Sequence, residues 1–420
     1  MKRGKIMEFN AETKRKLREE YDACVKLGLK LDMSRGKPGT EQLALSEGML
    51  TALSDGEDCV KGRAADYRNY GLLDGIPEMR ELVAELMDVK AENVIAGGNS
   101  SLNMMYDTIS AAMLFGVPGS EKPWSKYDKI SFLCVVPGYD RHFAITERMG
   151  INMINVPLHS DGPDMDMVES LVASDETIKG IWCVPKYSNP DGVTYSDETV
   201  RRMASLKPAA ADFRIFWDNA YALHDWYEQG DSLLNIISET EKAGNPDMVF
   251  EFMSTSKVTF PGSGVAAVIS SPANIAFLKK TMFYQTIGPD KLNQLRHVKF
   301  FGTADNLRRH MRRHADIIRP KFEYVLNKFE QELTGIAEWN VPRGGYFISL
   351  NVPDGCAART VQLLAGAGVK MTSAGSCFPY GKDPNDKNIR IAPTYPSMDE
   401  LRQATDLICL CVKLAASEKA

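Results

Sequence analysis

The chain has 420 residues, of which 44% are hydrophobic, 25% charged and 9% aromatic. This composition is that of a folded globular protein, and it excludes intrinsically disordered, collagen-like and small disulfide-stabilised classes. The net charge of -5 comes from 50 basic and 55 acidic side chains spread along the chain, so electrostatics gives no reason to expect a nucleic acid or an acidic membrane as a partner. These numbers favour an enzyme that acts on small molecules.

The sequence has no apolar stretch of the roughly 18 residues that a membrane span requires. The segment from Met1 to Asn10 is charged and lacks the apolar core of a signal peptide. We therefore expect a cytoplasmic protein with no membrane partner. The eight cysteines are scattered, several of them within apolar runs, which favours buried free thiols in a reducing compartment. Because no cysteine pair has the spacing of metal ligands, we expect no metal site.

In chain order, the first clear element is a helix that begins at Gly75-Ile-Pro77, because proline is tolerated in a first turn and the apolar residues that follow share one face. Short apolar runs then alternate with longer helical or loop stretches, which is typical of a parallel sheet covered by helices. The candidate strands are 93–96, 129–136, 151–157, 180–184, 214–217, 248–253 and 265–270. The pattern predicts an α/β fold with a mostly parallel, seven-stranded sheet wrapped by helices.

The C-terminal part of the chain follows a different pattern. A helical block at 307–334 precedes the apolar segment 344–350, and a helix-like stretch begins at Ser397. This arrangement predicts a smaller α+β domain. We expect a large cofactor-binding domain at 48–305 and a small domain formed by 1–47 and 306–420.

Polar side chains follow several predicted strands, at the edge where ligands of open α/β sheets bind. They are Asn189 after 180–184, Asp218 and Tyr221 after 214–217, and Ser254, Ser256 and Lys257 after 248–253. The segment 97–101 is rich in glycine and serine and precedes a predicted helix, so its backbone N–H groups suit a phosphate. An amine, a carboxylate, a phenol, an amide and a phosphate nest at one edge are the groups that pyridoxal 5'-phosphate requires.

Recognisable segments occur in a fixed order between Gly36 and Arg390: Gly98-Asn-Ser-Ser, Pro137-Gly-Tyr139, Asn189-Pro-x-Gly192, Asp218-x-Ala-Tyr221, Ser254-x-Ser-Lys257, Gly344-Gly-Tyr-Phe347 and Arg390. This order resembles the class I/II aminotransferases of fold type I, which depend on pyridoxal phosphate. Ser34-Arg-Gly-Lys-Pro38 and Pro137-Gly-Tyr-Asp-Arg-His142 make the chain most similar to a divergent bacterial aspartate aminotransferase subgroup. The resemblance implies an aspartate aminotransferase-like fold and ping-pong transfer of an amino group from L-aspartate to 2-oxoglutarate.

The resemblance implies catalytic roles for Lys257, Asp218 and Tyr221. Lys257 matches the lysine that binds the cofactor covalently and moves the proton of the substrate Cα. Asp218 matches the carboxylate that keeps the pyridine nitrogen protonated. Tyr221 and Asn189 match residues that donate hydrogen bonds to the phenolate oxygen of the cofactor. The alternatives are a solvated lysine, a capping aspartate and a turn asparagine.

Other matches concern cofactor binding and assembly. Tyr139 matches the aromatic residue that stacks on the cofactor, and His142 the histidine that supports Asp218. A core-edge tyrosine and a satisfied histidine are their alternatives. The phosphate would be bound by Ser254 and by the turn formed by Asn99, Ser100 and Ser101. Tyr70 matches a tyrosine that reaches the phosphate of the neighbouring subunit, which implies a homodimer with shared active sites.

For the substrate, Arg390 matches the arginine whose planar fork binds the α-carboxylate, and Gly36 offers backbone contact near that carboxylate. The alternative for Arg390 is an outward, solvated residue of a strand. The expected partners are therefore a small-molecule amino acid and a 2-oxo acid.

The sequence departs from the family pattern at two places. Many relatives have an arginine eight residues after the lysine, which binds the cofactor phosphate, but this chain has Val265 at that spacing and Gly264 in the nearest motif alignment. Dicarboxylate-specific relatives supply a second arginine near the position of Phe283. Local cations that could replace it are Arg35, Lys37 and Arg141, of which we favour Arg35 or Lys37. The alternative, that these three are only solvated, stays open.

Two motifs suggest other functions. The string 262–267 matches a dinucleotide-binding pattern, but it precedes a strand and not a helix, so we do not expect NAD. The basic segment 308–314 lies on an apolar stripe of Leu307, Met311 and Ile318, which predicts an amphipathic helix and not a nucleic-acid site.

The alternative functions on the same fold are a transaminase for another amino acid and a pyridoxal-phosphate-dependent lyase. A more remote alternative is the effector-binding domain of a transcription regulator. We expect the roughly thirty residues before Leu31 to be too few for a winged helix.

Overall fold

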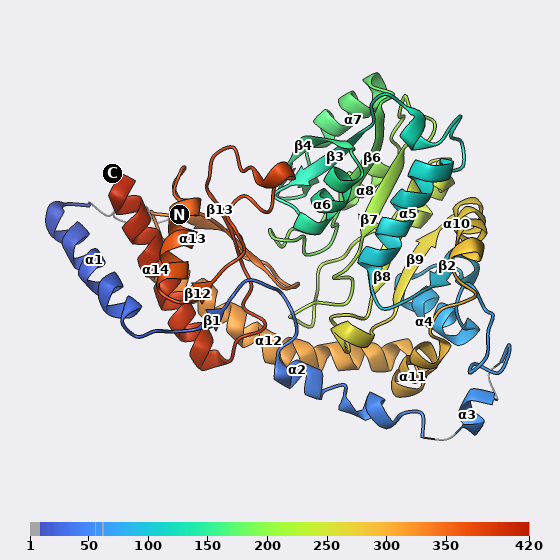
Figure 1. Cartoon of the computed structure of the whole chain (residues 1–420), viewed down its shortest axis with the longest axis horizontal. Coiled ribbons are helices and arrows are strands. Elements are labelled where there is room, and N and C mark those ends of the chain that lie inside the picture. Colours follow the sequence, from blue (N-terminus) through green and yellow to red (C-terminus); the bar gives the residue numbers. More distant parts are fainter. Residues whose placement is uncertain (1–8, 55, 61–62, 420) are drawn as a thin grey trace.

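The computed structural model describes residues 9–54, 56–60 and 63–419. Residues 1–8, which form most of the charged segment Met1 to Asn10, lie outside the described residues, as do 55, 61–62 and 420. The right-hand part of Figure 1 is built on an eight-stranded sheet in the order β2-β9-β8-β7-β6-β3-β4-β5. Its strands are β2 (Val94–Ala96), β3 (Ser131–Val136), β4 (Asn152–His159), β5 (Gly162–Pro163), β6 (Ile178–Cys183), β7 (Arg214–Asp218), β8 (Val249–Ser254) and β9 (Ala266–Ser270).

Strands β3, β4, β6, β7 and β8 pair in parallel, whereas β2, β5 and β9 run antiparallel to their neighbours. The predicted α/β class and mostly parallel sheet are confirmed, and seven strands coincide with the predicted runs. The predicted number of seven is one too few. The additional strand β5 consists only of Gly162 and Pro163, with a φ of 137° at Gly162, so it contains no apolar run that a sequence pattern could reveal.

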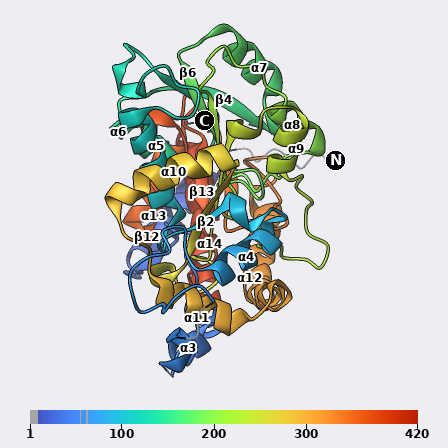
Figure 2. The same ribbon diagram turned by 90° about the vertical axis from the view of Figure 1, so that its right-hand side faces the viewer.

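The central strands are buried on both faces, and successive side chains enter different cores. In β3, Phe132 and Cys134 belong to one core, whereas Leu133 and Val135 belong to the core on the opposite face. The helices over the first face are α5 (Ser101–Phe115), α6 (Asp140–Arg148) and α10 (Pro272–Gln285). Those over the second face are α4 (Pro77–Met87), α7 (Met165–Ser174), α8 (Asp197–Ala204) and α9 (Ile236–Lys242). Figure 2 shows the molecule from the side of this sheet, with α10 and α4 facing the viewer.

The left-hand part of Figure 1 contains two small sheets. One is the parallel pair of β1 (Leu31–Asp32) and β12 (Val369–Lys370), and the other is the antiparallel set of β10 (Glu338–Trp339), β11 (Ile348–Asn351) and β13 (Asn388–Ile391). Helix α14 (Met398–Lys419) packs against α1 (Ala11–Val25) and α13 (Ala357–Gly366). The segments predicted at 344–350 and from Ser397 correspond to β11 and α14, so the additional α+β part is confirmed.

Helix α12 (Ala304–Leu333) runs along the base of both parts in Figure 1, after α11 (Lys291–Phe301) and beside the short α2 (Thr40–Ala44). The remaining helix, α3 (Glu57–Val60), is a single turn. The 30 residues of α12 span about 45 Å. Leu307 and Met311 pack with Val258 and Phe301, whereas Ile318 enters the core of the other part. The predicted amphipathic helix is confirmed, because its arginines at 308, 309, 312 and 313 are exposed and its apolar stripe is buried.

Within the described ranges, no helix combines the length and the apolar character needed to cross a membrane. The same ranges hold no group of three His, Cys, Asp or Glu side chains that could bind a metal ion. All eight cysteines are free thiols, and all except the half-buried Cys24 are buried.

Candidate active site

The strands β6, β7 and β8 end at a cavity of about 150 Å³. Because these strands are parallel neighbours, the residues that follow them meet at one edge of the sheet. The cavity is lined by Ser100, Ser101, Leu102, Met105, Tyr139, Val184, Asn189, Asp218, Ala220, Tyr221, Ser254, Ser256 and Lys257. Eight of the residues predicted to bind the cofactor therefore lie in one wall, together with Ser256.

Asp218, the last residue of β7, is buried and held on one side only. Its Oδ2 lies 3.0 Å from Nε2 of His142, and its Oδ1 is buried without a hydrogen-bond partner. The ring of His142 stacks on Trp182, with centroids 4.2 Å apart and planes 6° apart. The indole Nε1 of Trp182 in turn donates to Oγ1 of Thr146 at 2.8 Å. The carboxylate is thus fixed by a histidine while one oxygen remains available to a donor inside the cavity.

Lys257 follows β8 and points its amine toward two phenol rings. Nζ lies 4.9 Å from the ring centre of Tyr221 and 6.0 Å from that of Tyr346. Burial lowers the pKa of Lys257, with the positive charge of Arg390 adding to the effect and Asp218 opposing it. Burial also raises the pKa of Tyr221 well above its usual value and that of Tyr139 to about 12, so both phenols stay protonated at neutral pH. A lysine of this kind gives up its proton more readily than an exposed lysine.

A hydrogen-bond chain also holds the backbone of Lys257. The Tyr346 hydroxyl donates to the carbonyl oxygen of Lys257 at 3.3 Å and accepts from Nε2 of Gln42 at 2.9 Å. Gln42 lies in α2, so this chain connects the N-terminal segment to the cavity wall. Neither Tyr346 nor Gln42 was predicted as a site residue. The Gly344-Gly-Tyr-Phe segment contains a recognisable signal for Tyr346, whereas nothing in the sequence singles out Gln42.

Arg390, on β13, contacts Asn189 of the cavity wall from the second part of the molecule. Its Nη1 lies 2.8 Å from Oδ1 of Asp140 and 3.3 Å from Oδ1 of Asn189, and its Nη2 donates to Oγ1 of Thr372 at 3.3 Å. The guanidinium lies over the Phe347 ring at 4.9 Å. Arg390 is only 7% exposed, so the alternative of an outward, solvated strand residue is wrong.

Besides Arg390, which contacts the wall through Asn189, five predicted residues do not line the cavity: Asn99, Tyr70, Gly36, Arg35 and Lys37. Asn99 is exposed, but its carbonyl oxygen accepts a hydrogen bond from Oγ of Ser256 at 3.0 Å. Gly36 lies against the ring of Phe347, where an added Cβ would meet a ring carbon at 2.5 Å. Arg35 is exposed, and the Lys37 amine sits 3.6 Å above the Tyr395 ring. Tyr70 is 79% exposed.

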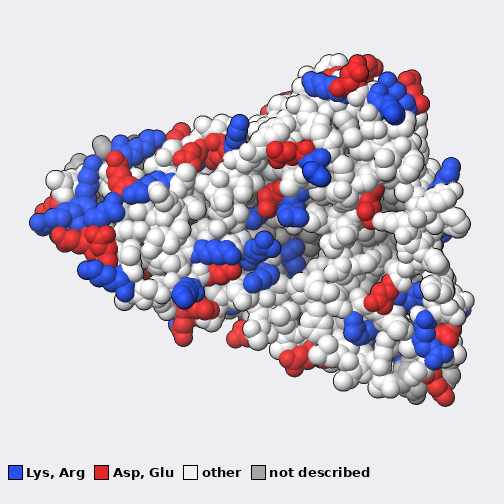
Figure 3. Space-filling view, in the orientation of Figure 1, with Lys and Arg blue, Asp and Glu red and all other residues white. Residues whose placement is uncertain are grey.

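The backbone is tightly packed at Gly264, in the turn after Lys257. A Cβ at Gly264 would lie 3.1 Å from the backbone nitrogen of Ser256, so a larger residue would require its neighbours to shift by a few tenths of an ångström. Another arginine approaches this turn from α11, since Nη2 of Arg296 donates to Oγ of Ser263 at 2.7 Å. Figure 3 shows further Lys and Arg side chains around a hollow in the middle of the molecular face.

Comparison with known proteins agrees with this geometry. A family profile described as aspartate amino-transferase matches residues 7–420. An aspartate aminotransferase of Corynebacterium glutamicum is 45% identical over 412 residues, which cover 98% of this chain and 94% of that protein. A Mycolicibacterium smegmatis relative, named as an aminotransferase without a substrate, is 51% identical over 393 residues, covering 93% of this chain and 92% of its own.

The crystal structure of an aspartate transaminase from Corynebacterium glutamicum matches the fold with a TM-score of 0.95 at 43% identity, covering 99% of this chain and 100% of that chain. A family match over almost the whole chain and relatives of this identity confirm the resemblance seen in the sequence. The chain therefore belongs to the aspartate amino-transferase family and is a transaminase.

Proposed function

We propose that this transaminase moves the amino group of L-aspartate to 2-oxoglutarate in a ping-pong cycle, with pyridoxal 5'-phosphate as its cofactor. The observation that carries the proposal is the single cavity lined by Lys257, Asp218 and Tyr221. The names of relatives add support, since two of those compared are an aspartate aminotransferase and an aspartate transaminase.

The polar groups of the cavity fit pyridoxal phosphate. The unpartnered Oδ1 of Asp218 is an acceptor for a protonated ring nitrogen. The N-terminus of α5 and the hydroxyls of Ser254 and Ser256 are donors for a phosphate. Lys257 supplies the primary amine that an aldehyde cofactor requires. When bound, the cofactor supplies an electron sink for the negative charge that develops at the substrate Cα.

Each side chain has a defined task in this proposal. Lys257 takes the proton from the substrate Cα and returns it later, and its lowered pKa favours the neutral amine that this requires. Asp218, held by His142, keeps a proton on the ring nitrogen. Tyr221 and Asn189 donate to the phenolate oxygen, and Tyr139 packs on the ring.

Arg390 binds the α-carboxylate of the substrate, with Gly36 beside it. The guanidinium of Arg390 already donates hydrogen bonds to the carboxylate of Asp140 and to the amide oxygen of Asn189. Because Asn189 lines the cavity, these donors point toward the cavity wall. For the distal carboxylate of aspartate we propose Arg35 or Lys37.

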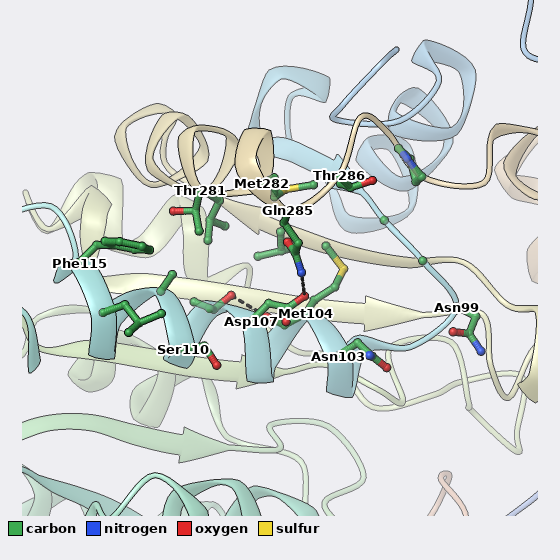
Figure 4. A pocket seen from close by; sticks show the side chains of 18 residues that line it. Asn99, Asn103, Met104, Asp107, Ser110, Phe115, Thr281, Met282, Gln285 and Thr286 are labelled. Atoms are coloured by element: carbon green, nitrogen blue, oxygen red, sulfur yellow. Dashed lines mark hydrogen bonds between the residues drawn. The ribbon is translucent and has the colours of Figure 1, made fainter. Parts of the chain in front are cut away.

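We also propose a homodimer with shared active sites, in which Tyr70 reaches the site of the partner subunit. Exposed apolar side chains occur on α5, on α10 and just after α10, where the backbone at Gly288 packs against Gly71, and such patches mark protein interfaces. They are Tyr106, Leu114, Phe115, Phe283, Tyr284 and Ile287. A groove of about 450 Å³ between α5 and α10 lies among them, with Gln285 donating to Asp107 across it at 2.8 Å (Figure 4).

The division into a large domain at 48–305 and a small domain formed by 1–47 and 306–420 stays a prediction, as does the cytoplasmic location. In support of the division, most residues of the core beneath the small sheets come from before Met33 or after Ile318.

Product analysis tests the proposed reaction. The purified protein is incubated with pyridoxal phosphate, L-aspartate and 2-oxoglutarate, and oxaloacetate and glutamate are measured over time. We expect the two products in equal amounts. An oxo acid formed without glutamate would indicate a lyase, and glutamate formed only with a different amino acid would replace aspartate as the donor.

A further inference from the structure

A second polar cavity lies behind the candidate active site and shares no lining residue with it. This rear cavity has a volume of about 460 Å³ and lies between the end of α4, helix α9, β8 and the loops that follow β6 and β7. Its floor contains Asn219, the residue next to Asp218, and Glu251 of β8. Both side chains are more than nine-tenths buried.

The two floor residues are an amide with one buried oxygen that has no donor and a carboxyl group that receives a single side-chain hydrogen bond. Glu251 receives one side-chain hydrogen bond, from Nδ2 of Asn219 to Oε1 at 2.9 Å, and among the described residues no lysine or arginine pairs with it. The Oδ1 of Asn219 is buried and has no partner. Burial raises the pKa of Glu251 to about 7, so the carboxyl is ionised above neutral pH. An ionised buried carboxylate without a cation is costly and favours a ligand that supplies one.

Both lysines that line the rear cavity already have partners. Nζ of Lys186 lies 2.9 Å from Asp225 and 3.1 Å from the carbonyl oxygen of Ala222, and Lys242 pairs with Glu239 at 2.6 Å. Asp88 is exposed at the rim. The apolar wall is formed by the half-buried side chains of Leu86, Leu233 and Leu234.

We propose that the rear cavity binds a small organic cation that carries a primary ammonium group on a short aliphatic chain. The ammonium donates hydrogen bonds to the carboxylate of Glu251 and to Oδ1 of Asn219, the residue whose Nδ2 already donates to that carboxylate. The aliphatic chain packs against the leucines of the wall. The lysines do not compete for the acceptors, because each has its own carboxylate.

The test uses n-butylammonium and the purified full-length protein, treated first with borohydride so that no bound aldehyde can react with the amine. Binding is measured by calorimetry or NMR titration. We expect saturable binding that weakens about tenfold between pH 8 and pH 6, because Glu251 becomes protonated over this range. Tetramethylammonium, which has no N–H donor, is expected to bind at least about tenfold more weakly.

Two variants locate the binding. Glu251→Gln keeps the shape and its contact with Asn219 and is expected to weaken n-butylammonium binding about tenfold or more. Glu239→Gln removes another carboxylate of the same cavity, one that already has a lysine partner, and is expected to change affinity less than about twofold. Thermal unfolding verifies that both variants are folded. Equal affinity in wild type and Glu251→Gln, or no saturable binding in the wild type, would overturn the proposal without affecting the transaminase assignment.

Discussion

His142 and Asp218 face each other at 3.0 Å in a fully buried contact between α6 and the end of β7. The stack of His142 on Trp182 fixes the imidazole, so the histidine leaves only one oxygen of Asp218 available to the cavity. His142 lies on α6, the helix that follows β3, whereas Asp218 is the last residue of β7, so the pair connects two different parts of the sheet. It therefore ties the geometry of the candidate site directly to the packing of the sheet.

The pair can be tested by replacing His142 with Asn. This change removes the stacked ring and leaves a buried carboxylate without its partner, so we expect a loss of about 1–3 kcal/mol in the free energy of unfolding and a lower kcat/KM. Urea unfolding and steady-state kinetics measure the two effects. His159→Asn is the matched control, because His159 is exposed and lies 3.7 Å from Asp164 at the surface. Equal effects of the two variants would argue against a special role for His142.

Lys257→Ala is expected to lower turnover by about 10⁴-fold or more while the fold persists, because no other amine lines the cavity in the described part of the chain. Turnover is measured with a coupled assay and the fold by circular dichroism. Lys280→Ala, at an exposed position of α10, is the control and should retain full activity. Retained transamination in Lys257→Ala would refute the assignment.

Arg390→Lys keeps the positive charge but loses the planar fork. Since each charged hydrogen bond contributes about 1.5–3 kcal/mol, we expect kcat/KM for aspartate to fall about 10- to 100-fold. The control is Arg402→Lys on the exposed face of α14, where the arginine pairs with Asp399. Unchanged kinetics in Arg390→Lys would mean that another group binds the α-carboxylate.

The distal carboxylate can be assigned by three parallel substitutions, Arg35→Met, Lys37→Met and Arg141→Met. We expect either the first or the second to reduce the preference for aspartate over alanine by about tenfold or more, because a carboxylate contact is lost for one substrate only. The Arg141 variant should keep the preference. If only Arg141→Met changes it, the proposed assignment is wrong.

A buried ion pair gives a pH-dependent prediction for stability. Nζ of Lys179 lies 2.7 Å from Oδ1 of Asp212, and both side chains are buried. Burial alone raises the pKa of Asp212, but hydrogen bonds from Lys179, Ser120 and Trp124 outweigh it and hold the pKa below the usual value. The stabilisation is therefore present above the unfolded pKa of about 3.9 and is lost as the pH falls through the lower folded value.

Lys179→Met should accordingly lower the free energy of unfolding by about 3–5 kcal/mol at neutral pH. The difference from wild type should shrink in acid, as urea unfolding at several pH values can measure. A difference that stays constant from neutral to strongly acidic pH would contradict this account.

Much of the cavity wall could be predicted from the sequence because its signals are local. Asp218 and Lys257 directly follow apolar runs that become β7 and β8, and these strands are parallel neighbours. Any parallel pair brings the residues after its strands to one edge, so the detailed strand order was not needed. Strand β5 was missed because two residues carry no periodicity.

The contacts that could not be predicted join distant segments. Trp182 lies within a uniformly buried strand, so nothing marks its ring as the support of His142. The ion pair of Arg390 with Asp140 spans 250 positions of the chain. His310 belongs to a basic stretch that looks solvated, yet it is buried and its Nε2 lies 2.9 Å from the carbonyl oxygen of Val258. Such pairings depend on how the two parts of the molecule meet.

The central claim is that Lys257 and Asp218 hold pyridoxal phosphate for a reaction with aspartate. The most direct measurement is the absorption spectrum of the purified protein with cofactor, recorded before and after L-aspartate and then 2-oxoglutarate are added. We predict a visible band that moves to the ultraviolet with aspartate and returns with 2-oxoglutarate. A protein that shows no visible band after incubation with pyridoxal phosphate, or a band that aspartate leaves unchanged, would contradict the claim.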